Sequence, residues 1–261
     1  MSQSAGEAGT PEPQQAEQQA EQQPEQQPQQ QQEQQQQRQR KNLVSGRFGS
    51  RRVLLFLTVL LIELIIFFVA MAFPLDPSQQ QSLNQEGQQL VESVNGGGPL
   101  DMFSGIFLNN VRIALIEAIP FAGPLFLGYS IFYTGEVLQA FAVSSTPPLP
   151  PLILGAVTFV FPHALLEFAG YAVAVTAGLM LIWAWIKKRL KMEIRTYAQE
   201  VLIAGAILLV AAATETLEIV TSETFLTLVL WVPMAIGIVV IWVWLHRIHT
   251  RQGQVAPTSP L

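Results

Sequence analysis

The feature that most constrains the fold is a series of long apolar stretches. The first covers residues 53–73 and is interrupted only by Glu63. A stretch of about 20 apolar residues is long enough to cross the hydrocarbon core of a bilayer as a helix. Half of all residues are apolar and only 13% are charged, which argues against an ordinary water-soluble domain. We therefore expect an all-α, polytopic bundle of membrane helices.

Prolines divide the later apolar stretches into shorter helices. Pro120 and Pro124 indicate a turn, because proline disrupts the interior of a helix. Pro162 leaves too few apolar residues before it to span a membrane, so we expect residues 152–161 to form a re-entrant or interfacial helix. About six transmembrane helices result, at residues 53–73, 104–120, 125–144, 163–186, 197–220 and 225–245.

The end of the first stretch, Ala70-Met71-Ala72, has the form of a signal-peptidase site. The apolar region of a signal peptide is only about 7–15 residues long and lies near the N-terminus. Residues 53–73 form a longer stretch and follow a long polar segment. We therefore interpret this stretch as an uncleaved membrane anchor.

The N-terminal segment, residues 1–52, is rich in Gln, Glu and Pro and has no helical or strand periodicity. Such a composition cannot bury enough apolar surface to fold, so we predict a disordered tail. As the role of this tail, we favour a solvated spacer over a Gln-rich segment for self-association. The tail ends in six basic residues that suit an anchor on anionic lipid better than a nucleic-acid site; they are Arg38, Arg40, Lys41, Arg47, Arg51 and Arg52.

The charged residues outside the apolar stretches separate by sign. Residues 74–103 contain Asp and Glu but no Lys or Arg, and we interpret them as an acidic external loop. All Lys and Arg except Arg112 lie in the tail, in residues 187–195 or near the C-terminus. By the positive-inside rule these basic segments are cytoplasmic. We predict a multi-pass protein of the cell membrane with both termini in the cytoplasm, a helix bundle at residues 104–246 and a short tail at 247–261.

Several polar residues fall within the apolar stretches. A charge at the centre of a bilayer costs about 2.5–3.5 kcal/mol, so we expect these side chains to face the interior of the bundle. Asn110 and Glu117 share a helix face, and His163 and Glu167 stack one turn apart. The predicted buried polar network contains Asn109, Asn110, Arg112, Glu117, His163, Glu167, Glu215 and Glu218.

Three interpretations of His163 and Glu167 stay open from the residues alone. They can form a hydrogen-bond network that fixes helix register, a site for an ion, a proton or a partner helix, or a metal site. The metal site is the least favoured, because the other histidines lie near the C-terminus. Glu63 can meet Arg112 in the bundle. The absence of cysteine excludes thiol nucleophiles and Cys-ligated metals, and we expect no metal and no cofactor.

Three polar motifs in otherwise apolar sequence resemble the stage II sporulation protein M family. They are Asn109-Asn110 followed by Arg112, Pro162-His163 followed by Glu167, and the glutamate-containing segment at residues 213–218. The resemblance covers about residues 104–222. One departure is Ala164, which stands where the family usually has Gly.

This resemblance implies a multi-pass integral membrane protein. The namesake of the family belongs to a complex that remodels peptidoglycan during engulfment in endospore formers. Carried over by position, the resemblance implies a candidate site at Asn109, Asn110, Arg112, His163, Glu167 and Glu215.

We expect the chain to act as a non-catalytic scaffold or subunit of a membrane complex. Its partners are then membrane lipid and other membrane proteins or further copies of itself, and not nucleic acid. The alternative is a permease-like transport subunit with a polar site in the middle of the membrane. A separate ATPase would drive it, because the chain has no phosphate-binding Gly-rich loop with Lys. A third hypothesis is an intramembrane enzyme that uses His163 and Glu167 as acid and base.

Overall fold

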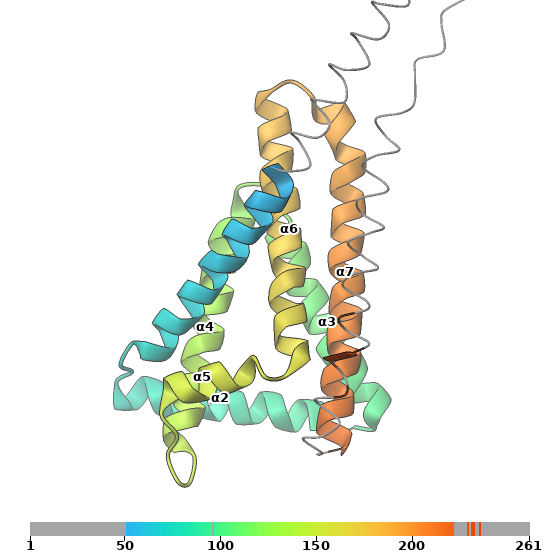
Figure 1. Cartoon of the computed structure of the whole chain (residues 1–261). Helices are drawn as coiled ribbons and strands as arrows, with labels where there is room; N and C mark the ends of the chain where they lie inside the picture. Colours follow the sequence, from blue (N-terminus) through green and yellow to red (C-terminus); the bar gives the residue numbers. More distant parts are fainter. Residues whose placement is uncertain (1–50, 96, 222–228, 230, 233–234, 236–261) are drawn as a thin grey trace, which may run out of the picture. The chain divides into compact units, whose positions relative to one another are not determined.

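The computed structural model describes residues 51–95, 97–221, 229, 231–232 and 235. No strand occurs in these ranges, so the all-α prediction is confirmed for them. Nearly all of the predicted tail and of the predicted span at residues 225–245, and the whole of residues 247–261, lie outside the described residues. The helices are Arg51–Ala72, α2 (Pro77–Asn95), α3 (Pro99–Glu117), α4 (Ala122–Ser144), α5 (Pro151–Thr158), α6 (Pro162–Ile186) and α7 (Leu190–Thr221) (Figure 1).

Proline starts four of these helices. It is the first residue of α2, α3, α5 and α6, where its fixed φ and its missing N–H suit the first helical turn. Helix α2 is also capped by Asp76, whose carboxylate accepts hydrogen bonds from the backbone N–H groups of Ser78 and Gln79, both at 2.9 Å. The Ser78 hydroxyl and these backbone donors lower the pKa of Asp76 below its usual value.

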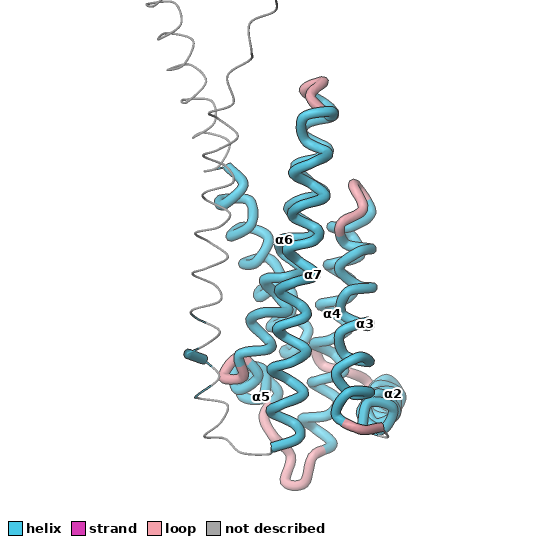
Figure 2. Tube along the Cα trace, turned by 90° about the vertical axis from the view of Figure 1, so that its right-hand side faces the viewer, coloured by secondary structure: helices cyan, strands magenta, loops and turns pink. Residues whose placement is uncertain are grey.

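Residues 74–103, which we expected to form a loop, instead contain α2 and the start of α3. The polar composition of α2 conceals its helical character, although Gln, Glu and Leu are good helix formers. Leu83 of α2 is buried, and the hydroxyl of Tyr133 on α4 donates a hydrogen bond to Glu86 on α2. Helix α2 therefore packs against α4, and it runs crosswise to α6 and α7 (Figures 1 and 2).

A tight turn joins α3 to α4. The backbone N–H of Ala122 donates to the carbonyl of Pro120 at 2.8 Å, and Phe121 between them has a φ of 66° and a ψ of −46°. This geometry is close to a classic γ-turn, which is rare and strained. A Cβ atom at Gly123 would lie 1.8 Å from the carbonyl oxygen of Glu117, so only glycine fits there. The turn predicted from the prolines of this segment is confirmed.

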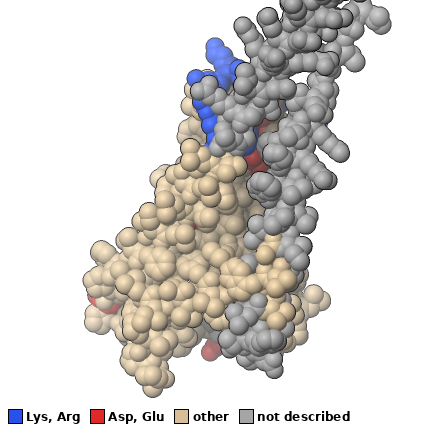
Figure 3. All heavy atoms as spheres, in the orientation of Figure 1, with Lys and Arg blue, Asp and Glu red and all other residues tan. Residues whose placement is uncertain are grey.

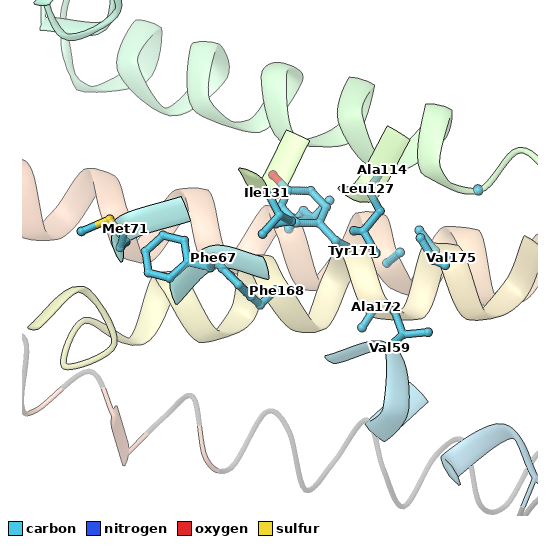
Figure 4. Close-up of a cluster of buried hydrophobic side chains, with 14 residues drawn as sticks. Val59, Phe67, Met71, Ala114, Leu127, Ile131, Phe168, Tyr171, Ala172 and Val175 are labelled. Atoms are coloured by element: carbon cyan, nitrogen blue, oxygen red, sulfur yellow. The ribbon is translucent and has the colours of Figure 1, made fainter. Parts of the chain in front are cut away.

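Helix α6 lies at the centre of the packing and contacts α3, α4 and α7. The ring of Phe168 on α6 meets the ring of Phe67 edge-on, with 5.7 Å between the centroids. These rings belong to a buried apolar cluster (Figure 4). Small residues allow close contact between helices: a Cβ atom at Gly178 would lie only 2.8 Å from the carbonyl oxygen of Ala118. Such contacts through small residues are typical of membrane helix bundles.

Three of the described helices are long and apolar enough to cross a membrane, namely Arg51–Ala72, α6 and α7. Helices α3 and α4 have 19 and 23 residues, but neither contains an 18-residue stretch that meets the same criterion. The short α5 lies within the segment predicted to be re-entrant or interfacial. The structure thus supports a membrane protein with several apolar helices, whereas the count of six spans stays a prediction.

The surface of the described helices is strongly apolar. Large hydrophobic side chains such as Leu54, Leu61 and Ile65 are more than half exposed. Lys and Arg gather at one end of the face shown in Figure 3, and the broad surface below them is mostly uncharged, with Asp and Glu atoms at only a few places. The exposed bases of residues 187–191 lie where α6 ends and α7 begins. An apolar surface of this extent with charge at one end suits a helix bundle that is surrounded by lipid.

Candidate functional site

Polar side chains from α3, α6 and α7 meet inside the bundle. Asn110 of α3 donates from Nδ2 to Oε1 of Glu167 on α6 at 2.5 Å. His163 at the start of α6 bonds through Nδ1 to Oε2 of Glu218 on α7, also at 2.5 Å. These two hydrogen bonds tie α6 to both neighbouring helices. We call the group of Asn110, His163, Glu167, Glu215 and Glu218 the inner cluster.

Glu215 completes the inner cluster. It lies one turn before Glu218 on α7 and is half-buried. Its carboxyl group interacts electrostatically with His163 and Glu167. The sequence suggested a pair of His163 and Glu167 on one helix. In the structure each of these two side chains bonds to a residue of a different helix. The inner cluster therefore links three helices rather than two turns of one.

Glu63 and Glu117 form a second polar group, which we call the carboxyl pair. Both residues are fully buried, with 0% of their surface exposed, and Glu117 acts electrostatically on Glu63. The hydroxyl of Ser130 on α4 donates to Oε1 of Glu117 at 3.0 Å. Neither carboxyl oxygen of Glu63 has a hydrogen-bond partner among the described residues. Glu63 thus lies in the interior of the bundle whereas Arg112 is exposed on α3, and the expected contact between them is wrong.

Tyr171 of α6 is a further polar residue in the interior of the bundle. It is buried and acts electrostatically with both members of the carboxyl pair and with Glu167 and Glu215 of the inner cluster. Figure 4 shows its ring among the apolar side chains between α4 and α6. We did not single out Tyr171 from the sequence, because a tyrosine in an apolar stretch looks like a packing residue. Its position one turn after Glu167 was the available signal.

Asn109 and Arg112 do not join the inner cluster. Both residues are exposed on α3, and Asn109 reaches the cluster only through a 3.5 Å contact with Asn110. Arg112 forms no ion pair with a carboxylate of the described residues. The expected burial of Asn109 and Arg112 is wrong. Arg112 instead lies in an open groove of about 500 Å³ whose other side chains are Leu108, Val111, Leu115, Ile116 and Ile119.

The helix geometry of α3 explains this difference. Its buried residues are Met102, Ile106, Asn110, Ala114 and Glu117, which recur every three or four residues. Arg112 follows Asn110 by two residues and is therefore rotated by about 200° around the helix axis. One face of α3 points into the bundle with Asn110 and Glu117, and the opposite face carries Arg112.

A third polar contact lies at the end of the bundle that carries the bases. Arg52, at the start of the first helix, is 8% exposed and forms ion pairs with Glu193 and with Glu200 on α7, the latter at 2.5 Å. The neighbouring Arg51 lies over the ring of Trp183 at 5.7 Å. We expected these two arginines to contact lipid headgroups. Arg52 instead holds the first helix against α7, a contact that no local sequence pattern signals.

The side chains of these groups can exchange protons and charge. The inner cluster contains an imidazole and carboxyl groups, and the chain has no cysteine to act as a nucleophile. The hydroxyls of Thr214 and Thr216 on α7 donate to backbone carbonyls of their own helix. In the described part of the chain, no group of three or more His, Asp or Glu side chains is placed to hold a metal ion.

Comparison with known proteins supports the resemblance drawn from the polar motifs. No curated protein and no solved structure matches the chain. Residues 52–217 match the family model described as Stage II sporulation protein M. This range contains the first helix except its first residue, the carboxyl pair, Arg112 and all of the inner cluster except Glu218. The chain therefore belongs to the stage II sporulation protein M family.

Proposed function

We propose that this chain is a non-catalytic subunit of a membrane protein complex and that it binds a partner through the outer face of α3. We define this outer face as Leu108, Arg112, Leu115 and Ile119, which are all exposed. The position of Arg112 in an apolar groove, without a carboxylate partner among the described residues, carries the proposal. Ionisable residues of membrane helices normally face the bundle interior or a wet cavity, so one on an apolar outer face needs a partner.

The depth of Arg112 follows from its neighbours on α3. Asn110 bonds to Glu167, and Ala118 contacts Gly178, so Arg112 lies alongside the length of α6. Helix α6 is apolar enough to cross a membrane. An arginine exposed to lipid near mid-membrane costs about 2.5–3.5 kcal/mol. A carboxylate from a partner helix would offset this cost and fix the position of that helix.

The partner that fits best is a membrane-spanning helix of a different protein, with an Asp or Glu at the depth of Arg112. A second copy of this chain fits less well. Most glutamates of the described spans are buried or half-buried within the bundle, and Glu193, Glu200 and Glu218 are already in ion pairs. Glu136 of α4 is half-buried and is the candidate that a second copy would offer.

Photo-crosslinking in native membranes tests this proposal. A photoreactive amino acid replaces Leu115 on the outer face, and a matched control carries it at Leu202, which is 73% exposed on α7. We expect position 115 to crosslink to an apolar segment of another protein that contains Asp or Glu, and position 202 to crosslink mainly to lipid. Crosslinks to lipid alone at position 115, or to a second copy of the chain, would contradict the proposed partner.

We further propose that the end carrying Arg52 and residues 187–191 faces the cytoplasm of a cell membrane, as the positive-inside rule implies. The chain has no cysteine, so one introduced cysteine reports on a single position. We expect Leu149→Cys, in the segment before α5, to react with an impermeant maleimide in intact cells. Lys187→Cys should react only after the cells are permeabilised, and the opposite pattern would invert the topology.

A permease-like subunit that works with a separate ATPase is the second candidate. The buried carboxyl groups of Glu63 and Glu117 and the half-buried one of Glu167 favour it, because transporters place ionisable side chains in the membrane interior. His163→Ala separates the two candidates. A transport subunit would lose flux in reconstituted vesicles while it still assembles, whereas a scaffold would lose assembly or abundance.

A further inference from the structure

We propose that Glu63 and Glu117 form a proton-binding site inside the helix bundle, in which these buried carboxyl groups take up protons rather than stay ionised. The site is independent of the partner proposed for the outer face of α3. Both residues are fully buried, and three of their four carboxyl oxygens have no hydrogen-bond partner among the described residues. The fourth oxygen, Oε1 of Glu117, accepts a hydrogen bond from Ser130.

A buried carboxylate without a counter-charge is very unfavourable, and two of them side by side cannot both stay ionised. A hydronium ion of the solvent that transfers its proton to one of these carboxylates breaks one of its own O–H bonds and leaves water. The carboxylate becomes a neutral carboxyl group that can donate a hydrogen bond. Each proton taken up in this way removes one uncompensated charge from the interior of the bundle.

The basic groups of the neighbouring helices are engaged elsewhere. Arg52, on the same helix as Glu63, pairs with glutamates of α7. His163 of α6 pairs with Glu218, and Arg112 lies on the opposite face of α3. No Lys, Arg or His of the described residues forms an ion pair with Glu63 or Glu117.

The other groups that face the carboxyl pair are neutral. Helix α4 contributes the hydroxyl of Ser130, and α6 contributes the phenol of Tyr171, which acts electrostatically with both carboxyls. The residues one turn away on the three contributing helices are apolar and buried: Val59, Phe67, Ala114 and Leu127. Among the described residues, no group of three or more His, Asp or Glu side chains is placed to hold a metal ion here, which favours a proton as the bound species.

Labelling of the full-length protein with dicyclohexylcarbodiimide tests the site. This reagent adds to protonated carboxyl groups in apolar surroundings, and mass spectrometry of peptides locates the adduct. We expect an adduct at Glu63 or Glu117 at neutral pH that declines as the pH rises and that excess sodium chloride does not prevent. The Glu63→Gln/Glu117→Gln variant should lose this adduct, and the control Glu136→Gln should keep it. An adduct that sodium suppresses would assign the site to sodium and overturn the proposal.

Infrared spectroscopy tests whether Glu63 and Glu117 are protonated if dicyclohexylcarbodiimide does not reach them. A protonated buried carboxyl group has a carbonyl stretch separate from that of a carboxylate. We expect this band at neutral pH in the folded wild-type protein and its loss in Glu63→Gln/Glu117→Gln. The amide variants keep the side-chain shape, and their thermal unfolding confirms that they are folded. A band that is absent from the wild type, or unchanged in the folded double variant, would overturn the proposal.

Discussion

Polar residues have opposite environments on the two faces of α3. On the inner face, Asn110 and Glu117 are buried and bond to α6 and α4. On the outer face, Arg112 is exposed among apolar side chains and pairs with no carboxylate of the described residues. The inner groups tie helices of the bundle together, whereas we propose that the outer arginine binds a partner. The contrast thus separates residues that stabilise this protein from the residue that we propose for partner binding.

The largest expected difference in stability is between two variants with the same substitution, Arg52→Leu and Arg112→Leu. Arg52→Leu leaves Glu193 and Glu200 without their shared counter-charge, which should destabilise the bundle by about 3–5 kcal/mol. Arg112→Leu removes a charge from an apolar face and should leave the thermal unfolding of the isolated protein unchanged or slightly raised. Thermal unfolding in detergent measures both. Equal destabilisation by the two substitutions would show that Arg112 is also structural.

We expect a smaller difference in stability when the adjacent residues Asn109 and Asn110 are each replaced by Asp. Asn110→Asp replaces the donor to Glu167 with a second carboxylate and should cost about 1–3 kcal/mol or more. Asn109→Asp makes the same chemical change on the exposed side and should cost much less. The abundance and the melting temperature of each variant in membranes provide the readout. Two equal losses would place Asn109 inside the cluster.

Glycine substitutions test how closely the end of α3 approaches α6. A Cβ atom at Gly178 would lie 2.8 Å from the carbonyl oxygen of Ala118, and overpacking of this kind costs about 1–3 kcal/mol. Gly205 of α7 has nothing within 4 Å of such an atom. Gly205→Ala should therefore be neutral or stabilising, because alanine is the better helix former. Urea or thermal unfolding that ranks Gly205→Ala below Gly178→Ala would contradict this packing.

The smallest expected effect on stability concerns Asp76 at the start of α2, which belongs to neither face of α3. Asp76 accepts hydrogen bonds from the first turn of this helix, and its pKa is lowered. The stability that Asp76 gives to α2 should be fully present above the pKa of Asp in an unfolded chain. It should be lost as the pH falls through the lowered pKa of Asp76 in the folded protein. Asp76→Ala should remove this dependence on pH. Hydrogen exchange of the α2 amides measures it, and a pH dependence that persists in Asp76→Ala would assign it to another group.

The sequence predicted the parts of the fold that depend on local rules. Apolar stretches and prolines indicated the all-α class, the turn at Pro120 and the start of α6 at Pro162, because proline acts on the backbone next to it. The same reasoning missed α2, since its polar composition resembles that of a loop. The match to the family covers residues 52–217 and confirms the resemblance that the polar motifs indicated.

The candidate site was harder to predict because it depends on contacts between helices. Spacing placed Asn110 and Glu117 on one face of α3, but adding Arg112 to that face ignored a rotation of about 200°. The pairing of His163 with Glu218 and of Glu63 with Glu117 joins residues that are 55 and 54 positions apart. Such contacts are set by how whole helices pack, and no local spacing in one sequence encodes them.

The most direct test of the account measures whether partner contact at α3 depends on the charge of Arg112. The photoreactive residue at position 115 is combined with Arg112→Leu and with Arg112→Lys, and crosslinks are compared in native membranes. The account predicts that Arg112→Leu abolishes the crosslink to the partner and that Arg112→Lys, which keeps the positive charge, retains much of it. A crosslink of full strength in Arg112→Leu would contradict the claim that this arginine holds a partner.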